Sequence, residues 1–314
     1  MHNAPYTATI RTMKVLVTGS SGTVGTRLCE KLLAQGSEVV GVDWRSNEWK
    51  PEIDALTIKA DLRDEASIDL LPKDVDAVAH LAANARVYEL VKDTSQARDN
   101  FITTFNVLEF ARRNAIPRFL FTSSRETYGN THDPVCTEDK ARIENCESAY
   151  TASKIGGEAL VEAYKRCYGM GTVIVRLSNV YGMYDNSDRV VPLFIRQAKA
   201  GELLTVFGEE KCLDFTYIDD TMQGLLLILE KFDDVKNETY NIAYGKGTTI
   251  VHLAEIIKEL LGSSSEIRID NNRPGEVIKY TADIAKARRA LGFAPTISFE
   301  DGIRKTIEWY AAHT

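Results

Sequence analysis

The sequence predicts an α/β fold in which a doubly wound parallel sheet is joined to a smaller C-terminal α/β lobe. Apolar runs typical of buried strands alternate with amphipathic helical patterns through most of the chain, as in sheets covered by helices on both faces. A glycine-rich turn also connects the first strand directly to the first helix. From about Asn179 the strands become shorter and the turns more frequent. We therefore expect a large domain over 13–178 and a smaller lobe, partly interleaved with the sheet, over 179–314.

Composition limits the classes of function. The chain has 314 residues, of which 44% are hydrophobic and 26% are charged, enough for a large core. Its formal net charge is −7 and it has no basic block, so a nucleic-acid partner has no electrostatic basis. No apolar run approaches the ~18 residues that a membrane span needs. Residues 1–12 lack the apolar segment of a signal peptide, so we expect a loose arm there, with Met13 as an alternative start.

The cysteines indicate a reducing compartment. Their number is odd and they form no C-x-x-C pair, which is typical of reduced thiols in a cytosolic protein. We therefore expect a cytoplasmic location, and we identify no metal ligands. The five cysteines are Cys29, Cys136, Cys146, Cys167 and Cys212.

Residues 14–25, KVLVTGSSGTVG, predict a strand, a tight turn and a helix N-terminus. Gly19 can take backbone angles that are closed to other residues, and the missing side chain at Gly22 lets a pyrophosphate approach the main chain. Gly25 lets the helix pack closely on the strand. Free N–H groups and the positive end of the helix dipole then face the phosphates. A glycine-rich loop without a ligand is the alternative explanation of this pattern.

The next apolar run, 38–43, predicts a second buried strand that ends in the carboxylate of Asp43. A carboxylate about 20 residues past the glycines accepts hydrogen bonds from the adenosine ribose hydroxyls. It also repels a 2′-phosphate, which favours NAD over NADP as the cofactor. Arg45 could soften this preference, and a plain strand-end cap is the alternative role for Asp43. A polar loop over 44–51 follows.

A third strand over 56–60 ends at Asp61. The carboxylate of Asp61 could reach the adenine of a bound dinucleotide, or it could cap a helix that begins near Arg63. A fourth strand over 76–83 ends in small residues, which leave room for a cofactor at the edge of the sheet. His80 on this strand is predicted to be a packed or hydrogen-bonded histidine rather than a catalyst.

The rest of the chain continues the alternation, with a long polar loop after Ser124. The predicted elements are an amphipathic helix over 100–114, a fifth strand over 118–122, a helix over 149–168, a sixth strand over 173–177 and two late helices over 251–261 and 299–312.

Tyr150 and Lys154 form a Y-x-x-x-K pair on the predicted helix 149–168, and the i, i+4 spacing places them on one face. A cationic Lys154 lowers the pKa of a neighbouring phenol from its free value of ~10. A phenolate can take a proton from a sugar or alcohol hydroxyl as hydride leaves the carbon. Ser124 ends the fifth strand, at the sheet edge where ligands bind, and could hold the same oxygen. A solvated Tyr/Lys pair is the alternative.

With these features assembled, the chain resembles the extended short-chain dehydrogenase/reductases, specifically the NAD-dependent epimerase/dehydratase family that acts on nucleotide sugars. The resemblance extends from about residue 14 to 310 and rests on TGSSGTVG, HLAA, FTSSRETYG, YTASK, RLSNVYG, DFTYIDD and RPGE in this order. It implies a Rossmann fold with a substrate-binding C-terminal lobe and NAD as the cofactor. It also implies a homodimer paired through the helices 100–114 and 149–168.

The resemblance further implies a role for each matching residue. It implies a catalytic set of Ser124, Tyr150 and Lys154, of which Tyr150 and Lys154 also touch the cofactor. It implies an NAD site made of Gly19, Gly22, Gly25 and Asp43, with Asp61 and Leu62 near the adenine. It also implies that Asn179 contacts the sugar nucleotide and that Arg273 contacts the diphosphate.

Two features bear on the substrate. The family often has an arginine before its Asp-Phe pair to clamp the nucleotide, whereas this chain has Leu213. The nucleotide must then be held by Arg273 and others, and Lys211 is a possible substitute. Arg86, just after HLAA, could reach a sugar carboxylate, or it could be an exposed helix arginine.

The residues after Ser124 bear on the reaction. In dehydratases of the family that this chain resembles, the corresponding residues are Thr-Asp-Glu or Thr-Ser-Glu. Their Glu removes the C5 proton, and the acid protonates the leaving hydroxyl. This chain keeps Glu126 but has Arg125 at the position of the acid, and arginine is a poor general acid. Glu126 could instead be structural, as a cap or as a partner of Arg125.

We therefore expect an NAD-dependent nucleotide-sugar 4-epimerase with a UDP-sugar as its substrate. It would oxidise the sugar transiently at C4 and return the hydride to the other face. The alternative, favoured by Glu126, is a 4,6-dehydratase or decarboxylase of the same family. A non-enzymatic NAD-binding sensor or scaffold is a third possibility.

Overall fold

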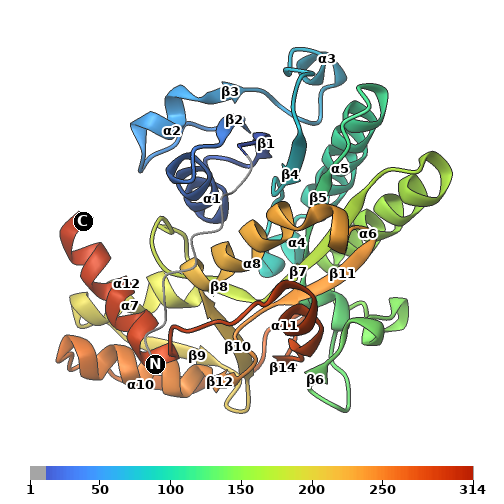
Figure 1. Cartoon of the computed structure of the whole chain (residues 1–314). Coiled ribbons are helices and arrows are strands. Elements are labelled where there is room, and N and C mark those ends of the chain that lie inside the picture. The colour runs from blue at the N-terminus through green and yellow to red at the C-terminus, as the bar shows by residue number, and fades with distance from the viewer. Residues whose placement is uncertain (1–11, 314) are drawn as a thin grey trace, which may run out of the picture.

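The computed structural model of the chain describes residues 12–313. It has a large lobe built on a seven-stranded sheet, and a smaller lobe that lies beneath it in the view of Figure 1. The arm predicted over 1–12 lies, except for Thr12, outside the described residues.

The large sheet confirms the predicted fold class. Its strand order is β11-β7-β5-β4-β1-β2-β3, and every neighbouring pair is parallel. The order reverses between β1 and β4, and open α/β sheets bind ligands in the crevice at such a reversal. The strands are β1 (Lys14–Thr18), β2 (Glu38–Asp43), β3 (Thr57–Lys59), β4 (Ala77–His80), β5 (Phe119–Ser124), β7 (Thr172–Leu177) and β11 (Glu238–Ile242).

Helices cover both faces of this sheet (Figure 1). They are α1 (Thr23–Ala34), α2 (Pro51–Ala55), α3 (Glu65–Ile68), α4 (Val87–Lys92), α5 (Ser95–Arg113), α6 (Ala149–Tyr168), α8 (Ile218–Glu230), α9 (Phe232–Val235) and α11 (Ala285–Leu291), with 3₁₀ turns η1 (Arg125–Tyr128), η2 (Glu138–Lys140) and η3 (Ile143–Asn145). Successive side chains of a strand point to opposite faces. Leu16 of β1 therefore packs with Val107 of α5 and Val161 of α6, whereas Val17 packs with Leu28 of α1 and Leu225 of α8.

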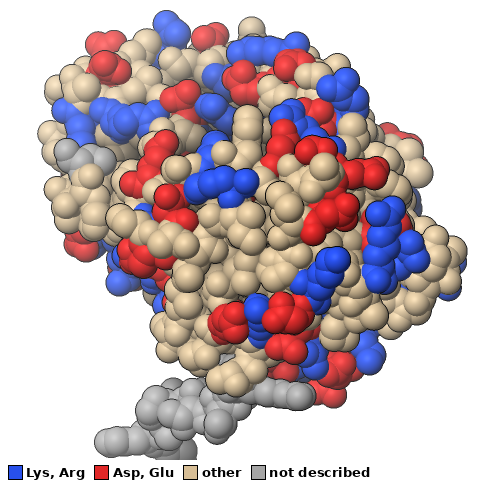
Figure 2. Space-filling model, turned by 90° about the horizontal axis from the view of Figure 1, so that it is seen from above, with Lys and Arg blue, Asp and Glu red and all other residues tan. Residues whose placement is uncertain are grey.

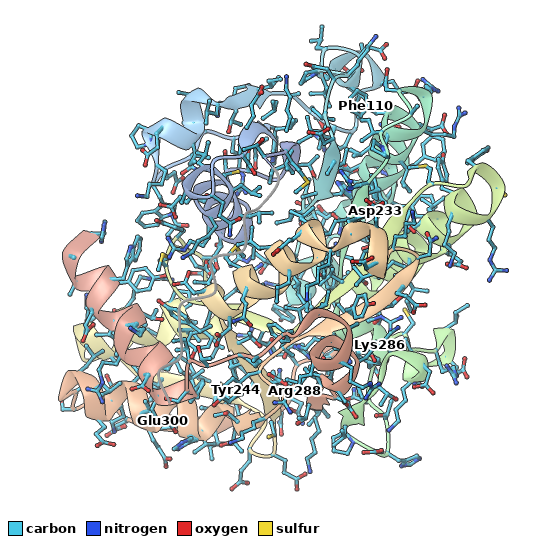
Figure 3. All side chains as sticks on the ribbon, viewed as in Figure 1. Phe110, Asp233, Tyr244, Lys286, Arg288 and Glu300 are labelled. Atoms are coloured by element: carbon cyan, nitrogen blue, oxygen red, sulfur yellow. The ribbon has the colours of Figure 1, made fainter. Side chains whose placement is uncertain are left out.

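The smaller lobe contains two short sheets. One has the order β12-β10-β14-β6 with β8 beside β10, and the other pairs β13 with β9. Its strands are β6 (Val135–Cys136), β8 (Asn179–Tyr181), β9 (Leu204–Phe207), β10 (Cys212–Tyr217), β12 (Gly247–Thr249), β13 (Ile267–Asp270) and β14 (Lys279–Ala282), and its helices are α7 (Val190–Ala200), α10 (Ile250–Leu261) and α12 (Phe299–His313). Figure 3 labels Tyr244 and Glu300 in this lobe, where they line one surface pocket.

Several helices differ from the sequence prediction. The sequence predicts only α10 and α12 after residue 179, whereas α7, α8, α9 and α11 are also present, and α2 begins at Pro51 where the polar loop was expected to end. Helix α8 starts at Ile218, immediately after β10 ends at Tyr217. No polar turn therefore marks the change from strand to helix.

Strand β11 comes from the second half of the chain but belongs to the large sheet. It pairs in parallel with β7, with Tyr240 opposite Val175. Both residues are buried. The second half of the chain therefore supplies the last strand of the large sheet.

The surface charges, the helices and the cysteines of the described chain bear on the predictions made from composition. On the face shown in Figure 2, Lys and Arg side chains are interspersed with Asp and Glu. None of the helices within residues 12–313 combines the length and apolar character needed to cross a membrane. The same residues contain no group of three His, Cys, Asp or Glu side chains that could hold a metal ion. All five cysteines are free thiols.

Candidate active site

The glycine turn between β1 and α1 has the geometry that its sequence predicts. Gly19 has a φ of +74°, and a Cβ there would lie 2.9 Å from the backbone nitrogen of Ala82. A Cβ at Gly25 would lie 2.0 Å from the carbonyl oxygen of Gly19. Both positions therefore require glycine. A Cβ at Gly22 would meet only the same oxygen, at 3.3 Å, so this glycine leaves open space beside the turn.

The N-terminus of α1 offers unpaired amides beside this turn. Gly22 is the N-cap residue, and its carbonyl accepts the first intrahelical bond from the amide of Thr26 at 2.8 Å. The amides of residues 23–25 precede this bond and have no partner within the helix. Together with the helix dipole they form a site for an anion such as a pyrophosphate.

Asp43 lies at the carboxyl end of β2, next to the glycine turn. Its buried carboxylate accepts hydrogen bonds from the amide of Ser21 at 3.1 Å and from the amide of Arg45 at 2.9 Å. The predicted strand-end cap is therefore present, and it also ties β2 to the turn. The exposed guanidinium of Arg45 is 3.7 Å from the same carboxylate.

The helix cap predicted for Asp61 is wrong. Helix α3 begins at Glu65, and its N-cap is Asp64, which accepts a hydrogen bond from the amide of Ala66 at 3.1 Å. Asp61 is instead paired with Arg63 at 2.6 Å, and this hydrogen bond lowers the pKa of Asp61. The neighbouring Leu62 is buried in the apolar core.

Ser124, Tyr150 and Lys154 are brought together in the protein interior. Ser124 ends β5, and the other two lie on the first turns of α6. Their exposed fractions are 9%, 6% and 6%, so the alternative of a solvated Tyr/Lys pair is wrong. Helix α6 is fixed at this point because the Ser148 hydroxyl accepts the amide of Thr151 at 3.2 Å.

The protonation of this set differs from the sequence prediction. Burial raises the pKa of Tyr150, and a hydrogen bond with Ser124 opposes the shift only in part. Lys154 was expected to lower this pKa, but its ammonium donates to the carbonyl of Thr122 at 2.9 Å. The ammonium lies 6.0 Å from the centre of the Tyr150 ring. Burial also lowers the pKa of Lys154 to about 8. Desolvation is therefore the largest cause of both pKa shifts.

His80 is the packed histidine that the sequence predicts. Its Nδ1 lies 2.7 Å from the hydroxyl of Thr18 and its Nε2 lies 3.2 Å from the hydroxyl of Thr104. It is 1% exposed, and burial lowers its pKa to about 3. The ring therefore stays neutral across the physiological pH range.

Arg125 and Glu126 form a buried ion pair directly after Ser124, on the turn η1. Nη2 of Arg125 lies 2.7 Å from Oε1 of Glu126, which confirms the structural pairing considered for Glu126. Arg125 also donates from Nε to the side-chain oxygen of Asn179 at 3.1 Å. Asn179 in turn donates to the carbonyl of Asp214 at 3.1 Å. The residue expected to contact a sugar nucleotide is thus linked to the end of β5.

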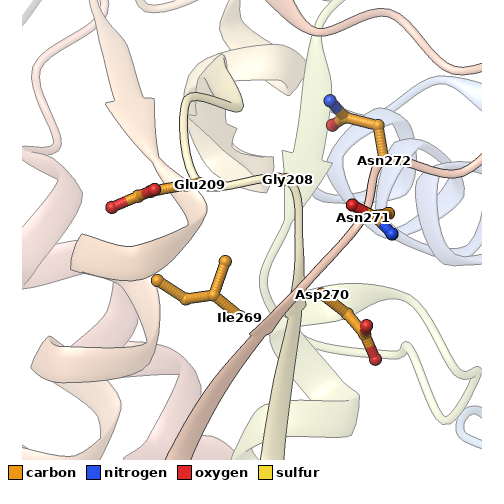
Figure 4. A pocket seen from close by; sticks show the side chains of 6 residues that line it. All are labelled: Gly208, Glu209, Ile269, Asp270, Asn271 and Asn272. Carbon is orange, nitrogen blue, oxygen red and sulfur yellow. The ribbon is translucent and has the colours of Figure 1, made fainter.

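The other residues expected to contact substrate lie in the smaller lobe or at its margin. Arg273 places its guanidinium 3.8 Å from the ring centre of Phe207 and 4.8 Å from that of Tyr88. Asn272, the residue before Arg273, lines a surface pocket between the end of β9 and the end of β13 (Figure 4). The pocket is lined by Gly208, Glu209, Ile269, Asp270, Asn271 and Asn272.

The remaining candidates have protein partners. The buried ammonium of Lys211 is paired with Glu276, and Leu213 is buried on β10. Arg86 is exposed immediately before α4, and it lies 3.1 Å from Asp188.

One residue near the site was missed from the sequence. Arg189, the N-cap residue of α7, is close enough to Tyr150 to lower the pKa of its phenol. The signal for it is an arginine that directly precedes the apolar helix after RLSNVYG. This signal is weak because the intervening segment is polar and irregular.

The parallel sheet, the glycine turn on α1 and the carboxylate of Asp43 define the dinucleotide-binding class of α/β proteins. The family model described as the NAD dependent epimerase/dehydratase family matches residues 15–243. The chain belongs to this family and is an NAD-dependent enzyme. The free amides of α1 suit the pyrophosphate of NAD, and Asp43 suits its ribose.

Three known proteins illustrate the range of reactions among the relatives. A dTDP-glucose 4,6-dehydratase of Actinoplanes is 31% identical, over 96% of this chain and 98% of the relative. The UDP-glucose 4-epimerase of Thermotoga maritima, solved with UDP-glucose, is 31% identical with a TM-score of 0.88, over 96% of this chain and 99% of that chain. The UDP-glucuronic acid 4-epimerase of Bacillus cereus, solved with UDP-glucuronic acid and NAD, is 29% identical with a TM-score of 0.89, over 96% and 100%.

Proposed function

We propose that this protein is an NAD-dependent nucleotide-sugar 4-epimerase that acts on a UDP-sugar. The observation that carries the proposal is the buried set of Ser124, Tyr150 and Lys154 at the carboxyl end of β5. The similarity to the Thermotoga maritima 4-epimerase supports it. So does Arg125, which occupies the position where a dehydratase would need an acid.

In the proposed reaction Tyr150 takes the proton of the sugar 4-hydroxyl. Ser124 hydrogen-bonds the phenol and holds the same sugar oxygen. Lys154 has a pKa of about 8, so it is charged at neutral pH and can hold the nicotinamide ribose. Bound NAD would supply the hydride acceptor and donor at C4. Tyr150 would give the proton back to the sugar oxygen after the 4-keto sugar has turned its other face.

The remaining contacts follow from where the side chains lie. The amides after Gly22 and the carboxylate of Asp43 would hold the cofactor, with Asp61 and Leu62 near its adenine. Arg273 would leave its aromatic neighbours to bind the diphosphate, and Asn179 would contact the nucleotide sugar. Arg86 and Lys211 would contribute only by exchanging their carboxylate partners for substrate.

Glu126 supports a second candidate, a 4,6-dehydratase. Its carboxylate is 3% exposed and is close enough to raise the pKa of Tyr150. Burial raises the pKa of Glu126 itself, which makes its carboxylate a stronger base. The Actinoplanes dehydratase is as similar as the epimerase from Thermotoga.

We also propose a homodimer formed through α5 and α6. Phe101 and Phe105 of α5 are 41% and 39% exposed, and large exposed aromatic rings on one helix face are typical of an interface. Gly156 of α6 lies against the Phe101 ring, where a Cβ would come within 3.0 Å. The free thiols favour a reducing compartment such as the cytoplasm.

The test is a panel of UDP-, dTDP-, GDP- and CDP-sugars incubated with the protein in D₂O and read by mass spectrometry and NMR. We expect an isomer of unchanged mass without carbon-bound deuterium. Loss of water, with deuterium next to a carbonyl, would establish the dehydratase instead. Absence of turnover with every sugar would refute the proposal and favour a sensor.

Replacement of the proposed base gives an independent check. Tyr150→Phe should retain bound NAD and lose turnover by about 10²–10⁴-fold, the contribution of a positioned acid–base group. Full activity of this variant would remove Tyr150 from its role. Lys154→Met is the matched control, because it should weaken NAD retention as well as turnover.

A further inference from the structure

The ion pair of Arg125 and Glu126 is buried beside the proposed reaction centre. The exposed fractions of the two residues are 8% and 3%. The amide of Glu126 donates to the hydroxyl of Ser124 at 3.2 Å, so the backbone of Glu126 is tied to a member of the catalytic set. Its carboxylate also acts electrostatically on Tyr150. The side chain of Glu126 is therefore buried next to the proposed catalytic set.

Each partner of this ion pair keeps one buried polar atom without a hydrogen bond among the described residues. These atoms are Nη1 of Arg125 and Oε2 of Glu126. A buried oxygen without a donor costs free energy, so stability alone does not account for the pair. The other charged groups that act on Glu126 are Lys211, Glu276 and Glu147. Since Lys211 is itself paired with Glu276, Arg125 is the direct cationic partner of Glu126.

Arg125 is anchored on two sides. Nη2 holds Glu126 at 2.7 Å, and Nε holds Asn179 at 3.1 Å. The guanidinium also lies 5.9 Å from the ring centre of Tyr280. These contacts come from η1, β8 and β14, so the guanidinium cannot turn away from Glu126 without breaking a contact with another element.

The proposed epimerase reaction makes such restraint useful. A 4-keto sugar has acidic protons on C3 and C5, because loss of either gives an enolate delocalised onto the C4 oxygen. If a carboxylate takes the C5 proton, the C–H electron pair forms the enolate double bond. The enolate then either recovers a proton from solvent at C5 or expels the C6 hydroxyl, which leaves as water after protonation. A free Glu126 would therefore divert the intermediate.

We propose that Arg125 is a positioning residue that keeps Glu126 from acting as a base on the 4-keto intermediate. The inference rests on the proposed function and deepens it, because it assigns the choice between hydride return and enolisation to one residue. With Arg125 in place, Oε1 of Glu126 is engaged and Oε2 is buried. The intermediate then has no competing proton acceptor while the hydride returns.

The experiment uses the full chain with its bound NAD, in D₂O, and UDP-glucose or whichever sugar of the panel the wild type converts. NMR measures deuterium at C3 and C5, and mass spectrometry measures loss of water. The wild type should give product without carbon-bound deuterium. With Arg125→Gln, deuterium should enter the sugar at C5 about 100-fold faster than with the wild type, which is the lower end of what a positioned general base contributes.

The double variant Arg125→Gln/Glu126→Gln is the matched control and should return exchange to the wild-type level. A purely structural role for Arg125 would lower activity without creating exchange that depends on Glu126. Wild-type exchange in Arg125→Gln, or exchange that persists in the double variant, would overturn the inference. If Arg125→Gln does not fold, Arg125→Lys decides, because it keeps the charge but loses the Asn179 anchor. Exchange above the wild type then supports the inference and its absence refutes it.

Failure of the proposed function would look different. A wild type that epimerises no sugar of the panel, or that itself loses water from the substrate, refutes the epimerase before any variant is made. A wild type that epimerises, together with variants that do not exchange, refutes only the role of Arg125.

Discussion

Replacing Gly25 by alanine should damage the protein scaffold as well as the cofactor site. The added Cβ would lie 2.0 Å from the carbonyl oxygen of Gly19 and 2.8 Å from its carbon. Both atoms belong to the backbone, so no side chain can swing aside. An ordinary contact is at least 3.4 Å, so the turn and α1 must separate by about 1.4 Å (3.4 − 2.0), and overpacking of this kind costs about 2–3 kcal/mol of unfolding free energy. At about 2 °C per kcal/mol for a chain of this size, Tm should fall by about 4–6 °C.

Gly22 offers a control three residues away in the same turn. A Cβ there would meet one atom at 3.3 Å, and its φ of −82° is open to alanine. Gly22→Ala should therefore keep Tm within about 1 °C of the wild type, while weakening NAD binding if the pyrophosphate approaches at this point. Thermal unfolding and NAD content of the purified variants measure the two effects. Equal Tm values for the two variants would refute the steric argument.

Three further predictions concern other parts of the chain. Asp43→Ala should weaken NAD binding by about 10–100-fold, the value of a hydrogen bond to a charged group, and should reduce discrimination against NADP. An unchanged ratio of the NAD and NADP affinities in calorimetry would contradict this role. His80 has a pKa of about 3 when folded against 6.5 as a free group. The unfolded state therefore binds more protons between these values, and the unfolding free energy falls as pH is lowered from 6.5 toward 3. Urea titrations at several pH values should show that the unfolding free energy of His80→Gln falls less steeply as the pH is lowered. Phe101→Asp should convert the proposed dimer to a monomer in light scattering, and an unchanged mass would exclude α5 from the interface.

The features predicted best from sequence are those with local physical causes. The requirement for glycine at Gly19 and Gly25 depends on backbone angles and on the packing of one turn against one helix. Tyr150 and Lys154 share a helix face because of their spacing alone. The packed state of His80 was predicted because its neighbours in the strand are apolar.

The features that were missed depend on contacts between distant segments. The pKa of Tyr150 is raised because the phenol is buried, and burial depends on the whole fold rather than on the Lys154 spacing. Lys154 donates to Thr122, which no periodicity indicates. The N-cap of α3 is Asp64 rather than Asp61. The helix is only four residues long, and so short a sequence pattern does not indicate where the helix begins. The anchor of Arg125 on Asn179 likewise joins residues 54 positions apart.

The position of β11 in the large sheet has a consequence for the order in which the protein is made. Its last residue, Ile242, is synthesised after about three-quarters of the chain, whereas domains generally fold as they leave the ribosome. Until that moment β7 is an edge strand with unpaired backbone groups, and such edges can pair with other chains. The nascent protein must therefore carry an incomplete nucleotide-binding sheet from the synthesis of Leu177, at the end of β7, until that of Ile242. Slow translation between β7 and β11 would lengthen that exposure, whereas release of β11 would end it.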